Sequence, residues 1–178
     1  MFGVMNLDRQ LFSGAPQAAS MRRALLALDG STTKVCAAIT QQPVTLILHQ
    51  QSQAARAPNC VQAVLGNGAC LTRVSSLVAA GQVLMDNLAY IRLDGLATNL
   101  LRGLTAGTVP IGHLLAGQLL RREALHDCAA LGPLLWQIVG LPDLAASRAY
   151  QIVDCHGPLM VIFETFRAGL SSSGWNAK

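Results

Sequence analysis

The chain has 178 residues, of which 52% are hydrophobic, 12% charged and 4% aromatic, and its formal net charge is +4. So apolar a composition excludes an intrinsically disordered chain, and the length suits one domain with its own core. The modest positive charge fits either an ordinary basic protein or one that binds an anionic small molecule. Basic residues run no longer than a pair and lack interleaved aromatic residues, so we expect no nucleic-acid partner.

The sequence predicts neither a membrane span nor a secretory signal. Its longest uncharged candidate segment, residues 128–142, is shorter than the ~20 residues that a spanning helix needs and contains Gly132, Pro133 and Gly140. The first residues lack a basic region followed by a long apolar one. Five cysteines form no CxxC pair and no zinc spacing with histidine. We therefore expect a cytoplasmic protein with reduced thiols, no metal, no cofactor and no membrane partner.

Hydrophobic patterns and turn signals predict the secondary structure. In chain order we expect a helix over residues 17–28, strands over 33–39 and 44–51, a loop or flap over 52–69, strands over 70–78 and 82–93, helices over 96–104 and 111–119, a strand near 126–131, a helix near 134–139, and a terminal hairpin of 150–154 with 158–166. Tight turns between successive strands indicate antiparallel pairing. The prediction is one α+β domain over residues 1–178, a single antiparallel β-sheet with helices packed on one side.

Glu164 is the first candidate for chemistry, because it interrupts the apolar strand PLMVIFETF. Strand alternation places Met160, Ile162 and Phe166 on the same face as this carboxylate. A buried carboxylate must be paired, protonated or placed in a wet pocket. The alternative is an ordinary glutamate at the edge of the sheet, facing solvent.

Arg73 is the complementary candidate, since it lies on a predicted strand with Leu71, Ser75 and Leu77 on its face, and we expect it to lie opposite Glu164 in a closed cavity. A guanidinium on a strand is a rigid fork that suits a carboxylate; the alternative is a surface arginine. A third feature is the turn of residues 107–112, where backbone amides at a helix start could accept an anion. That turn can equally be a simple junction between loop and helix.

Three segments carry a family resemblance: LTRVSSLVAAGQVLMDNLAYI (residues 71–91), LLRGLTAGTVPIGHLL (100–115) and YQIVDCHGPLMVIFETF (150–166). A weaker match is DGSTTKV (29–35), and residues 36–69 contribute little. In order and spacing these segments resemble the chorismate pyruvate-lyase (4-hydroxybenzoate synthase) family, especially its actinobacterial and cyanobacterial branch. The family fold, an antiparallel sheet with helices on one side and a ligand buried under flaps, agrees with the strand pattern.

The resemblance implies a site and a reaction. Arg73 would bind a substrate carboxylate, and Glu164 would contact the ring hydroxyl and act as the acid/base group. Backbone amides near Thr32 and Ile111 would help to hold the carboxylate. The reaction it implies eliminates pyruvate from chorismate and leaves 4-hydroxybenzoate, so the protein mainly orients its substrate.

One departure from the family pattern concerns the second carboxylate of chorismate. Where ubiquinone-pathway lyases have a second arginine, this chain has Asp86 and Asn87. We include both among the substrate-binding candidates, although Asp86 would repel a dianion if it faced the pocket. Lys34, Arg92 and Arg148 are the cations that could take the missing role.

Three functions remain open at this point. The first is a chorismate lyase. The second is an enzyme of the same fold, such as a natural-product cyclase or tailoring lyase, that acts on a different and more apolar substrate. The third is a non-catalytic small-molecule-binding or effector domain. Each would involve a small molecule, and the chain would be a monomer or a homodimer.

Overall fold

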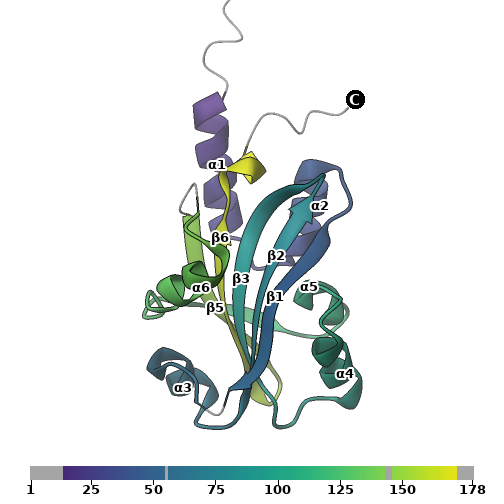
Figure 1. Cartoon of the computed structure of the whole chain (residues 1–178), viewed down its shortest axis with the longest axis vertical. Helices are drawn as coiled ribbons and strands as arrows, with labels where there is room; N and C mark the ends of the chain where they lie inside the picture. Colours follow the sequence, from purple (N-terminus) through teal and green to yellow (C-terminus); the bar gives the residue numbers. More distant parts are fainter. Residues whose placement is uncertain (1–13, 55, 143–145, 172–178) are drawn as a thin grey trace, which may run out of the picture.

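Six strands form one sheet at the centre of the molecule (Figure 1). The computed structural model describes residues 14–54, 56–142 and 146–171, so the ends of the predicted domain, 1–13 and 172–178, lie outside the described residues. The sheet order is β1-β2-β3-β6-β5-β4, and every neighbouring pair is antiparallel. The strands are β1 (Thr45–Ala54), β2 (Cys70–Ala79), β3 (Gln82–Arg92), β4 (Arg121–Leu125), β5 (Ala146–Asp154) and β6 (Gly157–Phe166). The predicted α+β fold with a single antiparallel sheet is confirmed.

Two tight hairpins, β2–β3 and β5–β6, set the topology. Ala80 and Gly81 join β2 to β3, and both have positive φ (46° and 77°), as a two-residue hairpin turn requires. The β5–β6 hairpin lies between β3 and β4 in the sheet, with β6 paired to β3 and β5 paired to β4. β1 and β4 are consequently the edges of the sheet, and β6 and β3, distant in sequence, become neighbours.

Helices cover both faces of the sheet. We call the face that carries Arg73, Asn87 and Glu164 the site face and the opposite one the far face. Helices α1 (Gly14–Leu26), α2 (Thr32–Thr40), α4 (Thr98–Ala106) and α5 (Ile111–Leu114) pack on the site face, whereas α3 (Asn59–Leu65) and α6 (Leu131–Val139) pack on the far face (Figure 1). A short 3₁₀ helix, Ala168–Ser171, follows β6. The helices are thus more widely distributed than the one-sided packing expected from the sequence.

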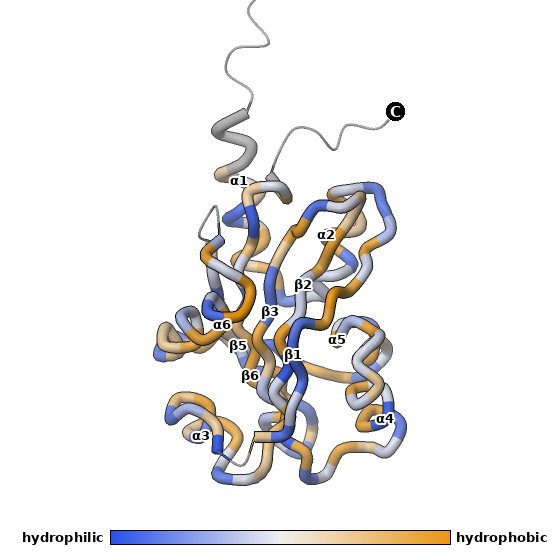
Figure 2. The backbone as a smooth tube through the Cα atoms, in the orientation of Figure 1, coloured by the Kyte–Doolittle hydropathy of each residue, from blue (hydrophilic) through white to orange (hydrophobic). Residues whose placement is uncertain are grey.

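Burial differs between the central strands and the edge strand β1. Strands β2, β3 and β6 are buried on both faces over most of their length. Strand β1 is largely exposed, and Figure 2 shows its backbone changing from hydrophobic to hydrophilic along its length. In the described part of the chain no further strand pairs with β1 at this edge of the sheet, so the helices are the elements that cover the site face.

The predicted strand over residues 33–39 is wrong, because this segment forms α2. The hydroxyl of Ser31 accepts a hydrogen bond from the amide of Lys34 and caps the helix. The buried positions follow a helical spacing, which the alternation of Val35, Ala37 and Ile39 concealed; they are Thr32, Thr33, Cys36 and Thr40. The connection to β1 is therefore a helix-to-strand loop and not a hairpin.

Three further segments differ from the sequence prediction. No strand forms over 126–131; β4 lies earlier, at Arg121–Leu125, and α6 begins at Leu131. Residues 52–69 are not a flap over the site, since they contain the end of β1 and helix α3, which packs on the far face. The helix expected over 111–119 ends after one turn, at Leu114.

Candidate functional site

Four polar residues from neighbouring strands form one row on the site face. The strand register pairs Ser75 with Asn87, Asn87 with Glu164, and Glu164 with Arg148. Directly paired residues of an antiparallel sheet point to the same side, so the four side chains lie next to one another. The insertion of β6 between β3 and β5 is what brings Asn87 and Arg148 to either side of Glu164.

Glu164 is only 2% exposed, and both of its carboxylate oxygens accept hydrogen bonds. Arg148 donates to Oε2 from Nε at 2.8 Å, and its Nη2 lies 2.8 Å from the same oxygen in the ion pair. Tyr150 donates its hydroxyl to Oε1 at 2.8 Å, and the hydroxyl of Thr32 lies 3.1 and 3.3 Å from the two oxygens. A cation and two neutral donors replace the water that this carboxylate has lost, which is why its burial is tolerated.

Arg148 joins the sheet to the segment between α1 and α2. Its guanidinium carbon lies 4.9 Å from the ring centre of Tyr150 and 5.6 Å from that of Phe166, within cation–π range. Nη1 donates to the carbonyl of Leu28, and Nη2 donates to the Thr32 hydroxyl at 3.0 Å. The ion pair with Glu164 therefore ties β5, β6 and the start of α2 into one unit.

The surroundings of this ion pair keep the neighbouring acids protonated. Burial raises the pKa of Tyr150 well above its usual 10, and the charge of Glu164 and the hydrogen bond to it raise it further. Burial, with a contribution from Glu164, also raises the pKa of the Cys36 thiol to about 12. Tyr150 thus remains a hydrogen-bond donor, and Cys36 is a thiol without nucleophilic character near neutral pH.

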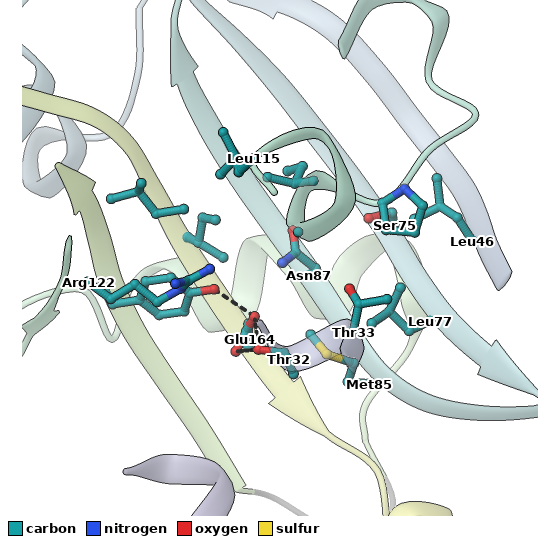
Figure 3. A pocket seen from close by; sticks show the side chains of 16 residues that line it. Thr32, Thr33, Leu46, Ser75, Leu77, Met85, Asn87, Leu115, Arg122 and Glu164 are labelled. Carbon is teal, nitrogen blue, oxygen red and sulfur yellow. Dashed lines mark hydrogen bonds between the residues drawn. The ribbon is translucent and has the colours of Figure 1, made fainter. Parts of the chain in front are cut away.

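A cavity of about 40 Å³ lies over the row, between the sheet and the helices α2 and α5 (Figure 3). The two helices meet closely at Gly112, where a Cβ atom would come within 2.8 Å of the Ser31 hydroxyl. The lining residues are Thr32, Thr33, Leu46, Ser75, Leu77, Met85, Asn87, Pro110, Ile111, Gly112, Leu115, Arg122, Tyr150, Ile152, Ile162 and Glu164. Polar groups therefore face an otherwise apolar chamber, an arrangement typical of small-molecule sites.

Arg73 is on the site face and fully buried, but it does not pair with Glu164. Its Nη2 donates to the carbonyls of Gly107 (3.1 Å) and Val109 (2.9 Å), which lie between α4 and α5. Its Nε and Nη1 have no hydrogen-bond partner, and burial lowers the pKa of the guanidinium. The expected juxtaposition of Arg73 and Glu164 is corrected accordingly: they share a face, but the partner of Glu164 is Arg148.

The other predicted site residues divide between the two faces. Thr32 and Ile111 line the cavity from above, and Asn87 lines it from the sheet. Asp86 points to the far face, because strand alternation separates it from Asn87; there it accepts a hydrogen bond from Ser76 at 2.6 Å and forms an ion pair with Arg167. Asp86 is therefore not part of the cavity and cannot repel a ligand in it.

Arg122 and Tyr150 are cavity residues that sequence reasoning did not select. Both lie at the end of the chamber formed by β4 and β5, and Arg122 comes from a strand that was predicted about five residues too late. The predicted strand began at Tyr150, whereas β5 begins at Ala146, so Arg148 lay outside the predicted strand; strand alternation places Arg148 and Tyr150 on one face only once the strand is extended. Of the cations proposed as substitutes for a second arginine, Arg148 is the one at the site, whereas Lys34 is exposed.

Two properties concern metals and membranes. Within residues 14–54, 56–142 and 146–171, no group of three or more His, Cys, Asp or Glu side chains is placed to hold a metal ion. No helix in the same ranges is both long enough and apolar enough to cross a membrane. The expected location, oligomeric state and lack of nucleic-acid binding stay predictions.

No family model matches the chain, and no curated protein matches it. Solved structures with a similar fold include the effector domain of PhnF from Mycobacterium smegmatis (15% identity over 79% of this chain and 90% of that chain, TM-score 0.43). Another is the C-terminal domain of the histidine utilization repressor from Pseudomonas syringae (10% identity over 71% of this chain and 92% of that chain, TM-score 0.46). A third is a GntR-family transcriptional regulator from Bacillus cereus (9% identity over 69% of this chain and 90% of that chain, TM-score 0.45). At these identities the likeness concerns the fold alone.

The identification of the chain as a chorismate pyruvate-lyase is wrong. The structural neighbours are domains of transcriptional regulators, and no family model supports a lyase. The elimination of pyruvate from chorismate to give 4-hydroxybenzoate, and the alternative of another enzyme of this fold, are withdrawn with it. The site gives a physical reason, since both carboxylate oxygens of Glu164 are held by internal donors, so this group is not free to exchange a proton with a substrate.

Proposed function

We propose that the chain is a small-molecule-binding domain that recognises its ligand in the cavity over Glu164 and does not transform it. One observation carries this proposal. The carboxylate of Glu164 is saturated by Arg148, Tyr150 and Thr32, whereas the amide oxygen of Asn87 beside it is buried without a hydrogen-bond partner. A buried acceptor left unpaired costs about 1–3 kcal/mol, and a ligand that donates to it recovers that cost.

Catalysis by Glu164 would require its internal hydrogen bonds to be broken. A general acid or base must reach the proton that it transfers. Here a cation and two hydroxyls already occupy the carboxylate. Glu164 therefore acts as an internal anchor that fixes the floor of the cavity.

The roof of the cavity gives the domain a means of responding to its ligand. A cavity of about 40 Å³ accommodates only about three water molecules, so a larger ligand must displace α5, a single helical turn. Arg73 holds the preceding segment through Gly107 and Val109, and we assign it the role of positioning this roof. In this proposal Asn87 hydrogen-bonds the ligand, and Thr32 and Ile111 contact it from above.

The test is a thermal-shift screen of uncharged and charged small metabolites against the purified chain. We expect some compounds to raise the unfolding midpoint of the wild type but not of Ser75→Leu, whose larger side chain fills the cavity. Gln53→Leu, on the exposed edge strand, is the matched control and should respond as the wild type does. Each active compound is recovered and analysed after incubation.

Two results would contradict the proposal. If no compound stabilises the wild type more than Ser75→Leu, the cavity is not a ligand site. If an active compound is recovered chemically changed, and Glu164→Gln prevents the change, the domain is an enzyme. Ser75→Leu must itself unfold cooperatively, which circular dichroism verifies in the same experiment.

A further inference from the structure

The cavity has an uncompensated positive charge. Its ionisable lining residues are Arg122, Glu164 and Tyr150. Glu164 is neutralised by Arg148, and Tyr150 is a protonated phenol. Arg122 remains, and no acidic side chain among the described residues lies within ion-pair distance of it. The lining of the cavity therefore carries one net positive charge that no part of the described structure balances.

The neighbouring residues on β4 show that the isolation of Arg122 is specific. Arg121 and Glu123 point away from the cavity and form an exposed ion pair of 3.2 Å. Strand alternation turns Arg122 the other way, towards the space that Asn87 and Glu164 face (Figure 3). Two adjacent arginines thus have opposite environments, one paired in solvent and one unpaired at a cavity.

The guanidinium of Arg122 is fixed in place but has donors to spare. Its Nη1 donates to the backbone carbonyl of Asp29 at 2.8 Å, a contact that orients the group without neutralising it. Its Nε is buried and has no hydrogen-bond partner. The guanidinium also lies close enough to Tyr150 for its charge to act on the phenol. An oriented, unpaired guanidinium fork is the group that proteins use to bind carboxylates and phosphates.

The remainder of the chamber defines the rest of the ligand. Between Arg122 and Asn87 the lining is aliphatic, with Ile152 and Ile162 on the sheet and Leu115 above. Asn87 contributes the unpaired amide oxygen, which needs a donor. These groups match a molecule with an acidic group, a small apolar body and a hydroxyl or amide donor.

We propose that the ligand is a small organic acid whose carboxylate pairs with Arg122 and whose hydrogen-bond donor meets Asn87. This inference rests on the proposed binding function and specifies the ligand class of the same cavity. Arg122 is then the residue that determines specificity, because it distinguishes an acid from its uncharged amide.

The experiment compares acids with their amides on the full chain. Propanoate, 3-hydroxybutanoate and benzoate are each titrated beside the corresponding amide, and binding is followed by ¹H–¹⁵N NMR at cavity residues. We expect at least one acid to bind about 10- to 100-fold more tightly than its amide, the ratio that a charge-assisted hydrogen bond implies. Arg122→Gln should remove this preference, and Arg122→Lys should keep part of it.

Arg121→Gln is the matched control, since it removes the same charge from the neighbouring position and should leave the preference unchanged. Amides that bind as tightly as acids, an Arg122→Gln variant that still prefers the acid, or no binding by any acid would each overturn the inference. The proposed binding function has its own contrary result in the thermal-shift screen. It is wrong if no compound, charged or neutral, stabilises the wild type more than Ser75→Leu.

Discussion

Glu164 and Arg148 illustrate how this fold buries charge at the level of single residues. The two side chains are 3% and 10% exposed, and they share Thr32 as a common hydrogen-bond partner. Each ion has lost its water, so each depends on the other for solvation. Such a pair contributes less to stability than its geometry suggests, but the removal of one member leaves an uncompensated charge.

A double-mutant cycle tests this dependence. We expect Arg148→Met to lower the free energy of unfolding by about 3–5 kcal/mol, because Glu164 is left buried without its cation. Combining it with Glu164→Leu should cost much less than the sum of the single changes, since the double variant buries no charge. Urea unfolding measures all three. The exposed ion pair of Arg121 and Glu123 is the control, for which we expect a coupling free energy of only about 0.2–1 kcal/mol. If the losses in unfolding free energy from Arg148→Met and Glu164→Leu are additive, the two side chains do not depend on each other and the prediction is wrong.

The two tyrosines predict how stability responds to alkali. Burial raises the pKa of both Tyr90 and Tyr150, so each stays protonated in the folded chain after it would ionise in the unfolded chain. The unfolded chain therefore releases protons first, and the contribution of these residues to stability is complete below about pH 10 and is lost as the pH rises above it. Phenolate absorbance should appear only on unfolding at this pH. A native chain that ionises near pH 10 would contradict the prediction.

At the scale of elements, two neighbouring strands hold the end of α4 and the segment that leads to α5. Arg73 on β2 donates to Gly107 and Val109, and Gln51 on β1 donates to the carbonyl of Thr105 at 3.0 Å. Gly107 ends α4 in a left-handed conformation, with φ 70°. A Cβ atom there would lie 2.7 Å from the side chain of Leu48 on β1. The sheet edge thereby fixes the position from which α5 covers the cavity.

Gly107→Ala should be more costly than an ordinary glycine replacement. We expect a loss of about 2–4 kcal/mol, from left-handed backbone strain together with the contact to Leu48. Gly117→Ala is the matched control, because its φ is 82° and nothing lies within 4 Å of the added atom; its cost should be about 1–2 kcal/mol. Introducing Leu48→Ala should reduce the cost of Gly107→Ala in chemical denaturation. Equal costs for the two glycines would show that the contact is unimportant.

The sequence predicts those elements whose local signals agree with their tertiary surroundings. The hairpin turns at Ala80-Gly81 and Cys155-His156 made β2, β3, β5 and β6 recognisable. Helix α2 was missed because β-branched residues dominate it and only the Ser31 cap and the spacing of its buried positions indicate a helix. Arg73 and Glu164 were correctly placed on strands and on one face, but their partners depend on strand order, which no local pattern specifies.

At the scale of the whole molecule, the two faces of the sheet are packed for different purposes. On the far face, side chains of β2, β3 and β6 pack with α3 and α6 in a continuous apolar cluster that contains Leu88 and Phe163. On the site face, two separate apolar clusters lie on either side of the cavity and its polar row. On the far face the buried carboxylate of Asp86 is paired with Arg167, whereas the site face gives up packing and hydrogen bonds to keep a cavity. Improving the packing of the site face should therefore stabilise the fold and impair binding.

Asn87→Leu tests this trade-off between stability and binding. The substitution removes a buried amide oxygen that has no partner and adds apolar volume to the cavity, at a position between Ser75 and Glu164 in the sheet. We expect the free energy of unfolding of the ligand-free chain to rise by about 0.5–2 kcal/mol. Ligands that stabilise the wild type should no longer do so, because their hydrogen-bond acceptor and their space are gone.

Urea unfolding with and without a ligand from the thermal-shift screen measures both effects of Asn87→Leu. Gln53→Leu adds the same side chain to the exposed edge strand, so it should change neither quantity. A less stable Asn87→Leu chain would mean that the amide contributes to the ligand-free fold. Undiminished stabilisation by the ligand would place the binding site elsewhere. Because the two effects have opposite signs, a merely structural role for Asn87 cannot produce both: loss of a structural contact lowers stability, whereas loss of a ligand contact leaves the free chain intact or more stable.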